Sequence, residues 1–345
     1  MKNMNFNYQK ICADLLKGLP QRTTDVIERR FGLKTGKRET LETIGQSYGI
    51  TRERVRQIEE EGFSKVRSRI EDYQKVFDYF DGILASFGDL KKEDDLLEFL
   101  GRDEFQNHIF FLLTNGNNFD RIPENKDFYP SWTRKKEAVN LAKKVIKLTV
   151  NKLEKEKKTL TLDELFEAQK REITKAVNRK INKDIFISYV EISKKIQKNP
   201  EKELGLRDWI EINPRGIKDR AYLVLRGEKK PLHFTKVATL IENLPFSPQR
   251  KTHIATVHNE LIKDQRFVLV GRGLYALKEW GYVPGVVRDI IFQVLKESKK
   301  PLPKKEILKK VLEQRFVKEN TVSLNLQDRD CFTRDSQGRY TIREA

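Results

Sequence analysis

The stretch TLETIGQSYGITRERVRQI, residues 40–58, predicts two short helices joined by a tight turn. Thr51 is placed to cap the second helix, because its hydroxyl can accept from an otherwise unpaired backbone N–H of the first turn. At about 100° per residue, the apolar side of that helix carries Val55, Ile58 and Gly62. The second helix is therefore expected to be amphipathic and to pack through that side.

The first helix supplies the surface for this packing. Leu41 and Ile44 share one of its sides. Gly45 permits a close approach between the two helices, and Gly49 suits the turn because glycine adopts backbone conformations that other residues avoid. Together the two segments predict a helix-turn-helix.

The opposite side of the second helix is polar and carries both signs of charge. It holds Arg52, Glu53, Arg56 and Gln57. Arginine can form two hydrogen bonds to guanine, glutamine can do the same to adenine, and glutamate can accept from cytosine. Readout of base edges in the major groove requires such an arrangement, whereas solubility alone would not.

Residues 10–70, which include LLKGLPQRTTDVIERRFGL and TRERVRQIE, resemble region four of the sigma-70 family of bacterial RNA polymerase sigma factors. The resemblance implies base contacts in the −35 promoter element by Arg52, Glu53 and Gln57. It implies contacts on the phosphate side by Arg54 and Arg56. The partners implied are double-stranded promoter DNA and bacterial RNA polymerase core.

The same resemblance assigns a polymerase contact to the segment VIERRFGL, which in the family docks on the flap of the β subunit. The candidate polymerase-binding residues are Val26, Ile27, Phe31 and Leu33. The alternative is that these four side chains simply form the core. Nothing after residue 72 resembles the family's region two, so initiation by this chain alone is not expected.

The composition favours a polyanionic partner. The chain of 345 residues has a formal net charge of +18, with 38% hydrophobic and 35% charged residues, which indicates several small cores with wide solvated faces. Cys12 and Cys331 form no metal-binding pattern, and the four histidines show no HExxH motif, so neither metal nor cofactor is expected. With no signal peptide and no apolar run long enough to span a membrane, a cytoplasmic protein without membrane contact is expected.

An internal repeat occupies the second half of the chain. KKPL occurs at 229–232 and again at 299–302. Further pairs are all separated by the same number of residues, which differs from the separation of the two KKPL motifs. These pairs are Thr256-Val257 with Thr321-Val322, Phe267 with Phe332, Gly273 with Gly338, and Tyr275 with Tyr340. The unit at 216–283 has three segments of helical apolar spacing and then an alternating segment that turns at Gly271-Arg272-Gly273. This order predicts a winged helix-turn-helix, in which Ile254, Val257, Leu261 and Ile262 of the third helix face inward.

A fainter copy lies upstream, because KKTLTLDELF at 157–166 resembles KKPLPKKEIL at 299–308. Residues 175–196 of that copy are expected to form a lysine-rich helix. Residues 110–132, which precede the copy, are consistent with another helix and hairpin. The fold class predicted is mainly α, with serial small helix-turn-helix and winged-helix modules and short β-hairpin wings. The predicted segments are 1–72 (sigma region-four-like), 73–135 (helical linker module), 136–215 (divergent winged helix), 216–283 and 284–345 (winged helices).

The unit at 216–283 resembles the HARE-type helix-turn-helix, most specifically in RFVLVGRGLYAL. This resemblance implies DNA binding by a winged helix. The residues expected to face a groove are Lys251, His253, Thr256 and Asn259, and those expected to reach phosphate are Arg266 and Arg272. The alternative is a winged helix that docks on protein.

Three functions follow from these patterns. The first is a DNA-binding transcription factor of the initiation machinery, which would also contact polymerase. The second is an adaptor that docks on polymerase without reading promoters, and it would not need Arg52, Glu53 and Gln57. The third, a catalytic subunit of a restriction or modification system, would need paired acids and a lysine, but KKEDDLLEF at 91–99 is typical of a solvated helical charge run. An enzyme is therefore not expected.

Overall fold

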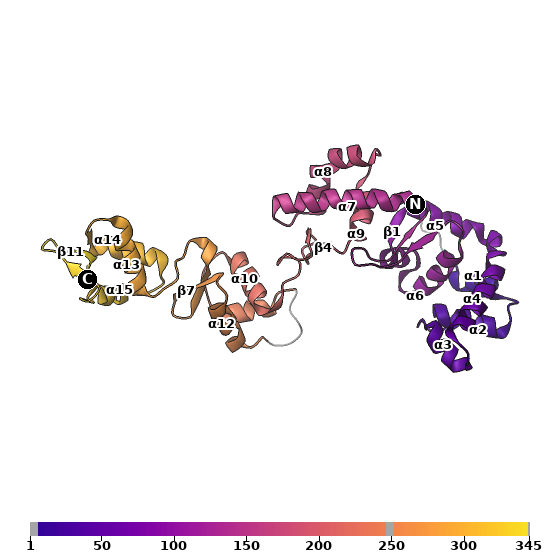
Figure 1. The fold of residues 1–345 in the computed structure, drawn as a ribbon, viewed down its shortest axis with the longest axis horizontal. Helices are drawn as coiled ribbons and strands as arrows, with labels where there is room; N and C mark the ends of the chain where they lie inside the picture. The colour runs from indigo at the N-terminus through magenta and orange to yellow at the C-terminus, as the bar shows by residue number, and fades with distance from the viewer. Residues whose placement is uncertain (1–5, 246–251, 344–345) are drawn as a thin grey trace. The chain divides into compact units, whose positions relative to one another are not determined.

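The computed structural model describes residues 6–245 and 252–343 and is mainly helical with small sheets. The chain divides into two compact units, Met1–Asp208 and Trp209–Ala345 (Figure 1). In the part that the structure describes, no helix is long and apolar enough to cross a membrane.

Four helices open the first unit and contain the expected helix-turn-helix. They are α1 (Tyr8–Leu16), α2 (Gln21–Phe31), α3 (Leu41–Tyr48) and α4 (Arg52–Arg67), followed by the short 3-10 helix η1 (Ile70–Tyr73). The helices α3 and α4 coincide with the two segments predicted from residues 40–58.

After η1 the chain repeats one order of elements: helix, strand, two helical segments, and a hairpin. The first copy comprises α5 (Gln74–Ser86), β1 (Leu90–Lys92), α6 (Glu93–Asn115), β2 (Asp120–Ile122) and β3 (Ser131–Thr133). Non-helical backbone angles at Arg102 divide α6 into two parts. The first strand pairs with the last, so that the antiparallel sheet has the order β1-β3-β2.

The second copy completes the first unit. It comprises α7 (Lys136–Glu156), α8 (Leu162–Val177), α9 (Lys183–Glu191), β4 (Ile196–Lys198) and β5 (Leu204–Leu206). A single bridge from Leu160 to Leu204 stands where the other copies have their first strand. The helix expected over residues 175–196 is broken, because Asn178 adopts left-handed backbone angles and Asn182 caps a new helix through its side chain.

The second unit holds two further copies. One comprises α10 (Gly216–Glu228), β6 (Leu232–His233), α11 (Phe234–Glu242), α12 (Ile254–Lys263), β7 (Phe267–Gly271) and β8 (Leu274–Leu277), followed by η2 (Lys278–Trp280). The other comprises α13 (Val287–Ser298), β9 (Leu302–Pro303), α14 (Lys304–Gln314), α15 (Glu319–Leu326), β10 (Phe332–Arg334) and β11 (Arg339–Ile342). Their sheets, β6-β8-β7 and β9-β11-β10, repeat the order of the first copy.

The first lysine of the repeated KK motif lies in the turn that follows the first helix of a copy. Lys157, Lys229 and Lys299 each cap that helix in the left-handed backbone region, with φ of 53°, 55° and 51°. Three residues later a buried leucine, at 160, 232 or 302, fastens the chain to the sheet. A lysine at a helix C-terminus also interacts favourably with the helix dipole.

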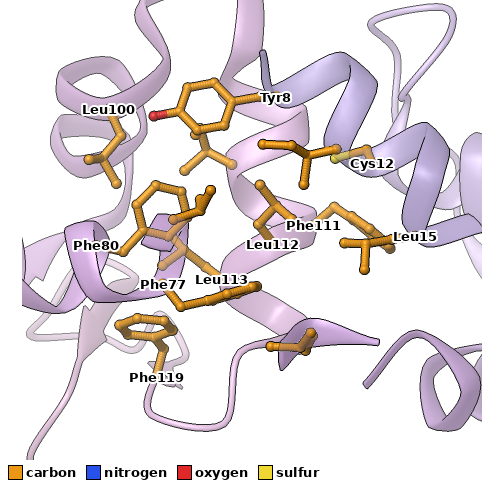
Figure 2. Close-up of a cluster of buried hydrophobic side chains, with 14 of the residues drawn as sticks. Tyr8, Cys12, Leu15, Phe77, Phe80, Leu100, Phe111, Leu112, Leu113 and Phe119 are labelled. Atoms are coloured by element: carbon orange, nitrogen blue, oxygen red, sulfur yellow. The ribbon is translucent and has the colours of Figure 1, made fainter. Parts of the chain in front are cut away.

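One hydrophobic core extends through the helix-turn-helix segment and the first copy (Figure 2). Tyr8, Cys12 and Leu15 of α1 pack with Phe77 and Phe80 of α5 and with three side chains of α6, Phe111, Leu112 and Leu113. The predicted boundary between residues 72 and 73 therefore lies inside a single core.

Polar contacts join the first two copies. The Tyr189 hydroxyl donates to the Gly88 carbonyl at 2.8 Å, and Lys91 pairs with Glu191 at 2.8 Å. Lys91 is buried in β1, and the buried Glu93 pairs with Arg121 through two hydrogen bonds of 2.5 and 2.8 Å. Residues 91–99 are therefore not a wholly solvated charge run, because these two charges hold neighbouring elements together.

Only two of the four side chains predicted to face inward from the third helix of the 216–283 unit are buried. Val257 and Leu261 are buried in α12, whereas Ile254 and Ile262 are 49% and 61% exposed. The helix buries a single narrow stripe against α10 and α11, so the two isoleucines at its edges remain outside the core.

Candidate nucleic-acid interface

The turn between α3 and α4 is built from the residues that the sequence singles out. The Thr51 hydroxyl oxygen accepts from the Arg54 backbone N–H at 3.2 Å, which caps α4. Gly49 has a φ of 65°, a left-handed conformation that glycine adopts without strain. A Cβ on Gly45 would lie 2.8 Å from the Ile50 carbonyl oxygen. The close approach expected at Gly45 is therefore present.

The apolar sides of the helices form a small core of their own. Val26, Ile44, Val55 and Ile58 are buried together, with Leu41, Tyr48 and Ile50 packed against them. This core fixes the orientation of α4 relative to α2 and α3.

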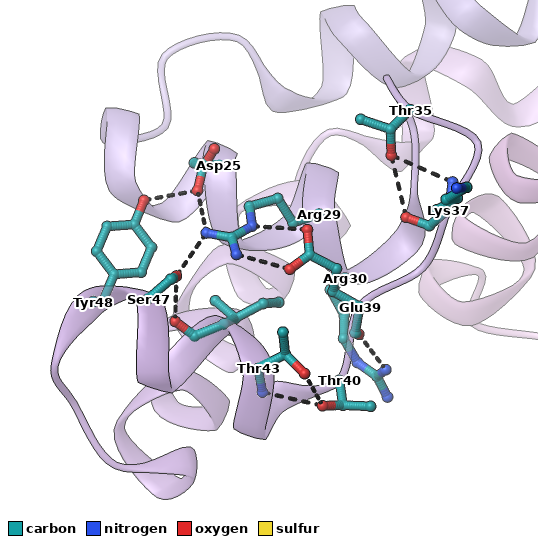
Figure 3. A network of polar contacts seen from close by, with 11 residues as sticks. Asp25, Arg29, Arg30, Thr35, Lys37, Glu39, Thr40, Thr43, Ser47 and Tyr48 are labelled. Carbon is teal, nitrogen blue, oxygen red and sulfur yellow. Dashed lines mark hydrogen bonds and ion pairs between the residues drawn. The ribbon is translucent and has the colours of Figure 1, made fainter.

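A polar network around Arg29 supports the same arrangement (Figure 3). Its guanidinium donates to both carboxylate oxygens of Glu39, at 3.0 and 2.7 Å, and to the Ser47 hydroxyl at 2.9 Å. Asp25 lies 3.6 Å from Arg29 and accepts from the Tyr48 hydroxyl at 2.7 Å. The network thereby joins α2, the loop after it and α3. Sequence reasoning missed it, because only the Asp25–Arg29 pair follows helical spacing, whereas the contacts to Glu39, Ser47 and Tyr48 cross from α2 to other segments.

The expected readout side chains lie together on the exposed side of α4. These exposed residues are Arg52, Glu53, Arg54, Arg56 and Gln57. Glu53 and Arg56 form an ion pair at 2.8 Å, and Arg54 donates to the Gln57 side-chain oxygen at 3.0 Å. The hydrogen bonds from Arg56 lower the pKa of the Glu53 carboxyl, so Glu53 is ionised at neutral pH. The surface offers arginine donors, a carboxylate acceptor and an amide within one helix face.

The residues expected to bind DNA in the 216–283 unit are only partly free to do so. His253, Thr256 and Asn259 are exposed at α12, and Arg272 is exposed at the hairpin turn. Lys251 lies outside the described residues. Arg266 is paired within the protein, with Asp264 at 2.7 Å and Asp219 at 2.9 Å, and these carboxylates raise its pKa. Its expected contact with phosphate is therefore opposed by two existing ion pairs.

The residues expected to contact polymerase are mostly core. Val26, Ile27 and Phe31 are buried, and only Leu33 is partly exposed. Phe31 packs edge-on against Phe111 of α6, with ring centroids 5.3 Å apart. The three buried side chains are unavailable to a partner in this conformation, because their packing completes the cores on either side of α2.

The loop after α2 is held by the same helix that covers Phe31. The Asn107 amide of α6 donates to the Gly32 and Gly36 carbonyls at 3.2 and 2.9 Å and accepts from Arg38 at 2.7 Å. Arg38 lies over the Phe110 ring, 3.9 Å from its centroid. A contact between residues so far apart in the chain leaves no signal in the sequence.

Residues 15–68 match the family Sigma-70, region 4. Over 54 residues, the chain is 46% identical to the RNA polymerase sigma factor SigA of Bacillus sp, and the match covers 16% of this chain and 14% of that protein. These residues therefore form a sigma-70 region 4 domain, a DNA-binding helix-turn-helix that in its family recognises the −35 element and contacts RNA polymerase. The chain spans only a small part of the length of its sigma factor relative.

Proposed function

We propose that the protein is a sigma-like transcription factor of the bacterial initiation machinery that binds −35-type promoter DNA. The observation that carries this proposal is the exposed face of α4 within the matched region 4 domain. Arg52, Glu53 and Gln57 would contact base edges, and Arg54 and Arg56 would contact phosphate. The proposed activity is binding without a catalytic step, and no cofactor is part of it.

The second part of the proposal is a contact with RNA polymerase core at the β flap. Burial of Val26, Ile27 and Phe31 limits which side chains of the segment 26–33 can take part. In the conformation described here, such a contact would use Leu33 and the partly exposed polar residues of α2.

The third part concerns the copies at 136–215, 216–283 and 284–345, which we propose are winged-helix modules. The order of three helices and a hairpin supports this assignment, as does the pairing of the first strand with the last in the copies at 216–283 and 284–345. In the copy at 136–215, the Leu160–Leu204 bridge takes the place of that pairing. We propose that the 216–283 module is of the HARE type and binds DNA through His253, which precedes α12, through Thr256 and Asn259 of α12, and through Arg272 at the wing.

The decisive experiment titrates the full chain against a duplex that carries a −35-type element and against a scrambled duplex, at two salt concentrations. The unmodified protein is expected to prefer the element at least tenfold, about 1.4 kcal/mol. Gln57→Ala and Arg52→Ala should remove most of that preference. Lys65→Ala is the matched control for Arg52→Ala, because Lys65 is an exposed cation near the other end of α4. Equal binding to both duplexes would reject promoter readout.

The second candidate is an adaptor that docks on polymerase without sequence-specific DNA binding. Exposed apolar side chains in the 216–283 copy favour it, namely Ile254, Ile262 and Leu269. Such an adaptor would capture core polymerase in a pull-down, and Gln57→Ala would leave that capture unchanged. Ile262→Ser would weaken it if this module makes the contact.

A further inference from the structure

The helix α7 carries a row of lysines that neither the fold nor the region 4 domain explains. Residues 138–153, which form most of α7, contain no acidic residue. At about 100° per residue, one side of the helix carries Asn140, Lys143, Lys144, Lys147 and Asn151, which are all exposed. These five residues are called the α7 ridge below.

The lysines of the ridge are not used in ion pairs. Lys144 and Lys147 have no carboxylate within 4 Å among the residues that the structure describes, and Lys143 contacts only the Phe128 ring, 5.9 Å from its centroid. The buried side of the helix is apolar apart from Thr149, whose hydroxyl donates to the Val145 carbonyl, and comprises Ala138, Ala142, Val145, Ile146, Thr149 and Leu153. Packing therefore does not require the charges on the opposite side.

The internal repeat provides a comparison for the ridge. The equivalent first helices α5, α10 and α13 have 13, 13 and 12 residues, whereas α7 has 21. Counted back from the left-handed lysine, Lys147 corresponds to Asp219 and Asp289. Each aspartate accepts a backbone N–H at the start of its helix, at 2.8 Å. The same fold thus forms with an acid at this position, so the lysine is not needed for folding.

The ridge has the length of a short stretch of duplex. It runs from Asn140 to Asn151, about 17 Å along the helix axis, which is about half of one turn of a DNA duplex, about 34 Å. Asparagine amides among the lysines can donate to phosphate oxygens. The region 4 domain lies in the same compact unit as α7. Double-stranded DNA is therefore the polyanion that the proposed function brings to this unit.

We propose that the α7 ridge is a second DNA-binding surface, which contacts the phosphate backbone of the duplex held by α4 or of DNA continuous with it. This inference rests on the proposed function, because it takes duplex DNA as the partner. The ridge is expected to contribute affinity without base discrimination, because contacts from lysine to phosphate carry no sequence information.

The test compares two triple variants of the full chain. One is Lys143→Gln, Lys144→Gln, Lys147→Gln, in which glutamine keeps a high helix propensity. The control is Lys10→Gln, Lys75→Gln, Lys126→Gln, which removes the same charge from exposed lysines elsewhere in the first unit. Each protein is titrated with the −35 duplex and the scrambled duplex over a series of salt concentrations.

The ridge variant should bind both duplexes more weakly by the same factor, and the slope of log K against log salt should shrink by about 3. The ratio between the two duplexes should stay as in the unmodified protein. The control variant should keep most of the original slope.

Two outcomes would overturn the inference. In one, the ridge variant behaves as the control does, while Gln57→Ala still erases the preference for the element; the proposed function then stands without the ridge. In the other, the ridge variant loses binding to a single-stranded RNA or to core polymerase but keeps its DNA slope, which would assign the ridge to that partner. Absence of duplex binding by the unmodified protein would instead reject the proposed function itself.

Discussion

Glu53 and Arg56 are joined on the exposed face of α4, with an Oε1–Nη2 distance of 2.8 Å. Both side chains are more than half exposed, so the pair contributes little to stability. It does hold Arg56 toward Glu53 and places a negative charge in the surface that would approach phosphates. Under the proposed function, this charge would oppose non-specific binding.

Glu53→Ala should weaken discrimination by strengthening binding to the wrong DNA. The substitution removes a carboxylate that repels phosphate and frees Arg56 for a backbone contact. We expect the scrambled duplex to bind more tightly at low salt and the ratio between element and scrambled duplex to fall several-fold. Titration of both duplexes measures this, with Glu61→Ala as a control for loss of an exposed acid in α4. An unchanged ratio would contradict a role for Glu53 in discrimination.

Gly45→Ala should disorder the helix-turn-helix. The added Cβ would lie 2.8 Å from the Ile50 backbone oxygen, so α3 and α4 must separate, at a cost of about 1–3 kcal/mol. Gly82→Ala is the matched control, because nothing lies within 4 Å of the new Cβ in α5 and alanine should stabilise the helix by about 1 kcal/mol. Hydrogen exchange of α3 and α4 amides reports the difference. Equal protection in both variants would show that the turn tolerates a wider helix spacing.

The parts of the fold that sequence could predict are those made by neighbours in the chain. The Thr51 cap, the turn at Gly49 and the buried side of α4 depend on residues three or four positions apart, and their spacing is visible directly. The packing of Phe31 against Phe111 joins residues 80 positions apart. The sequence left Phe31 open between a polymerase contact and a core position, and it could not show that α6 covers this ring.

The sequence revealed the internal repeat only where the copies share identical residues. The copies in the second unit share KKPL, and the second copy retains KKTL. In the first copy, Asp89 holds the left-handed turn instead of lysine, and Leu90 follows it directly as the buried leucine. The first copy was recognised from the pairing of its strands, because no short sequence motif encodes that pairing.

The left-handed lysine of a repeat should be replaceable by glycine but not by valine. Lys229 has a φ of 55°, a conformation that costs an ordinary residue about 1–2 kcal/mol and a β-branched residue more. We expect Lys229→Gly to preserve or raise the stability of the second unit, and Lys229→Val to lower it. Lys230→Val is the control, since Lys230 is equally exposed and has no positive φ. Thermal unfolding distinguishes these variants, and equal loss from both valine substitutions would rule out a conformational cause.

The last prediction concerns His108, which makes the stability of the first unit depend on pH. Its side chain is buried, its ring lies edge-on to Phe105 with centroids 5.8 Å apart, its Nδ1 has no hydrogen-bond partner in the described part of the chain, and burial lowers its pKa below the usual value of 6.5. The imidazole is therefore neutral in the folded protein at neutral pH. As the pH falls through about 6.5, the unfolded chain binds more protons at this residue than the folded chain does, so the folded state loses stability.

The effect is measurable because His108 is the sole histidine of residues 1–208. Between pH 7.5 and 5.5, protection of α1 and α6 amides should decrease, with a slope of at most about 1.4 kcal/mol per pH unit. His108→Leu replaces the ring by an apolar side chain and should remove the contribution of the buried imidazole to this slope. Persistence of the slope in His108→Leu would mean that another group, and not the buried imidazole, takes up the proton on unfolding.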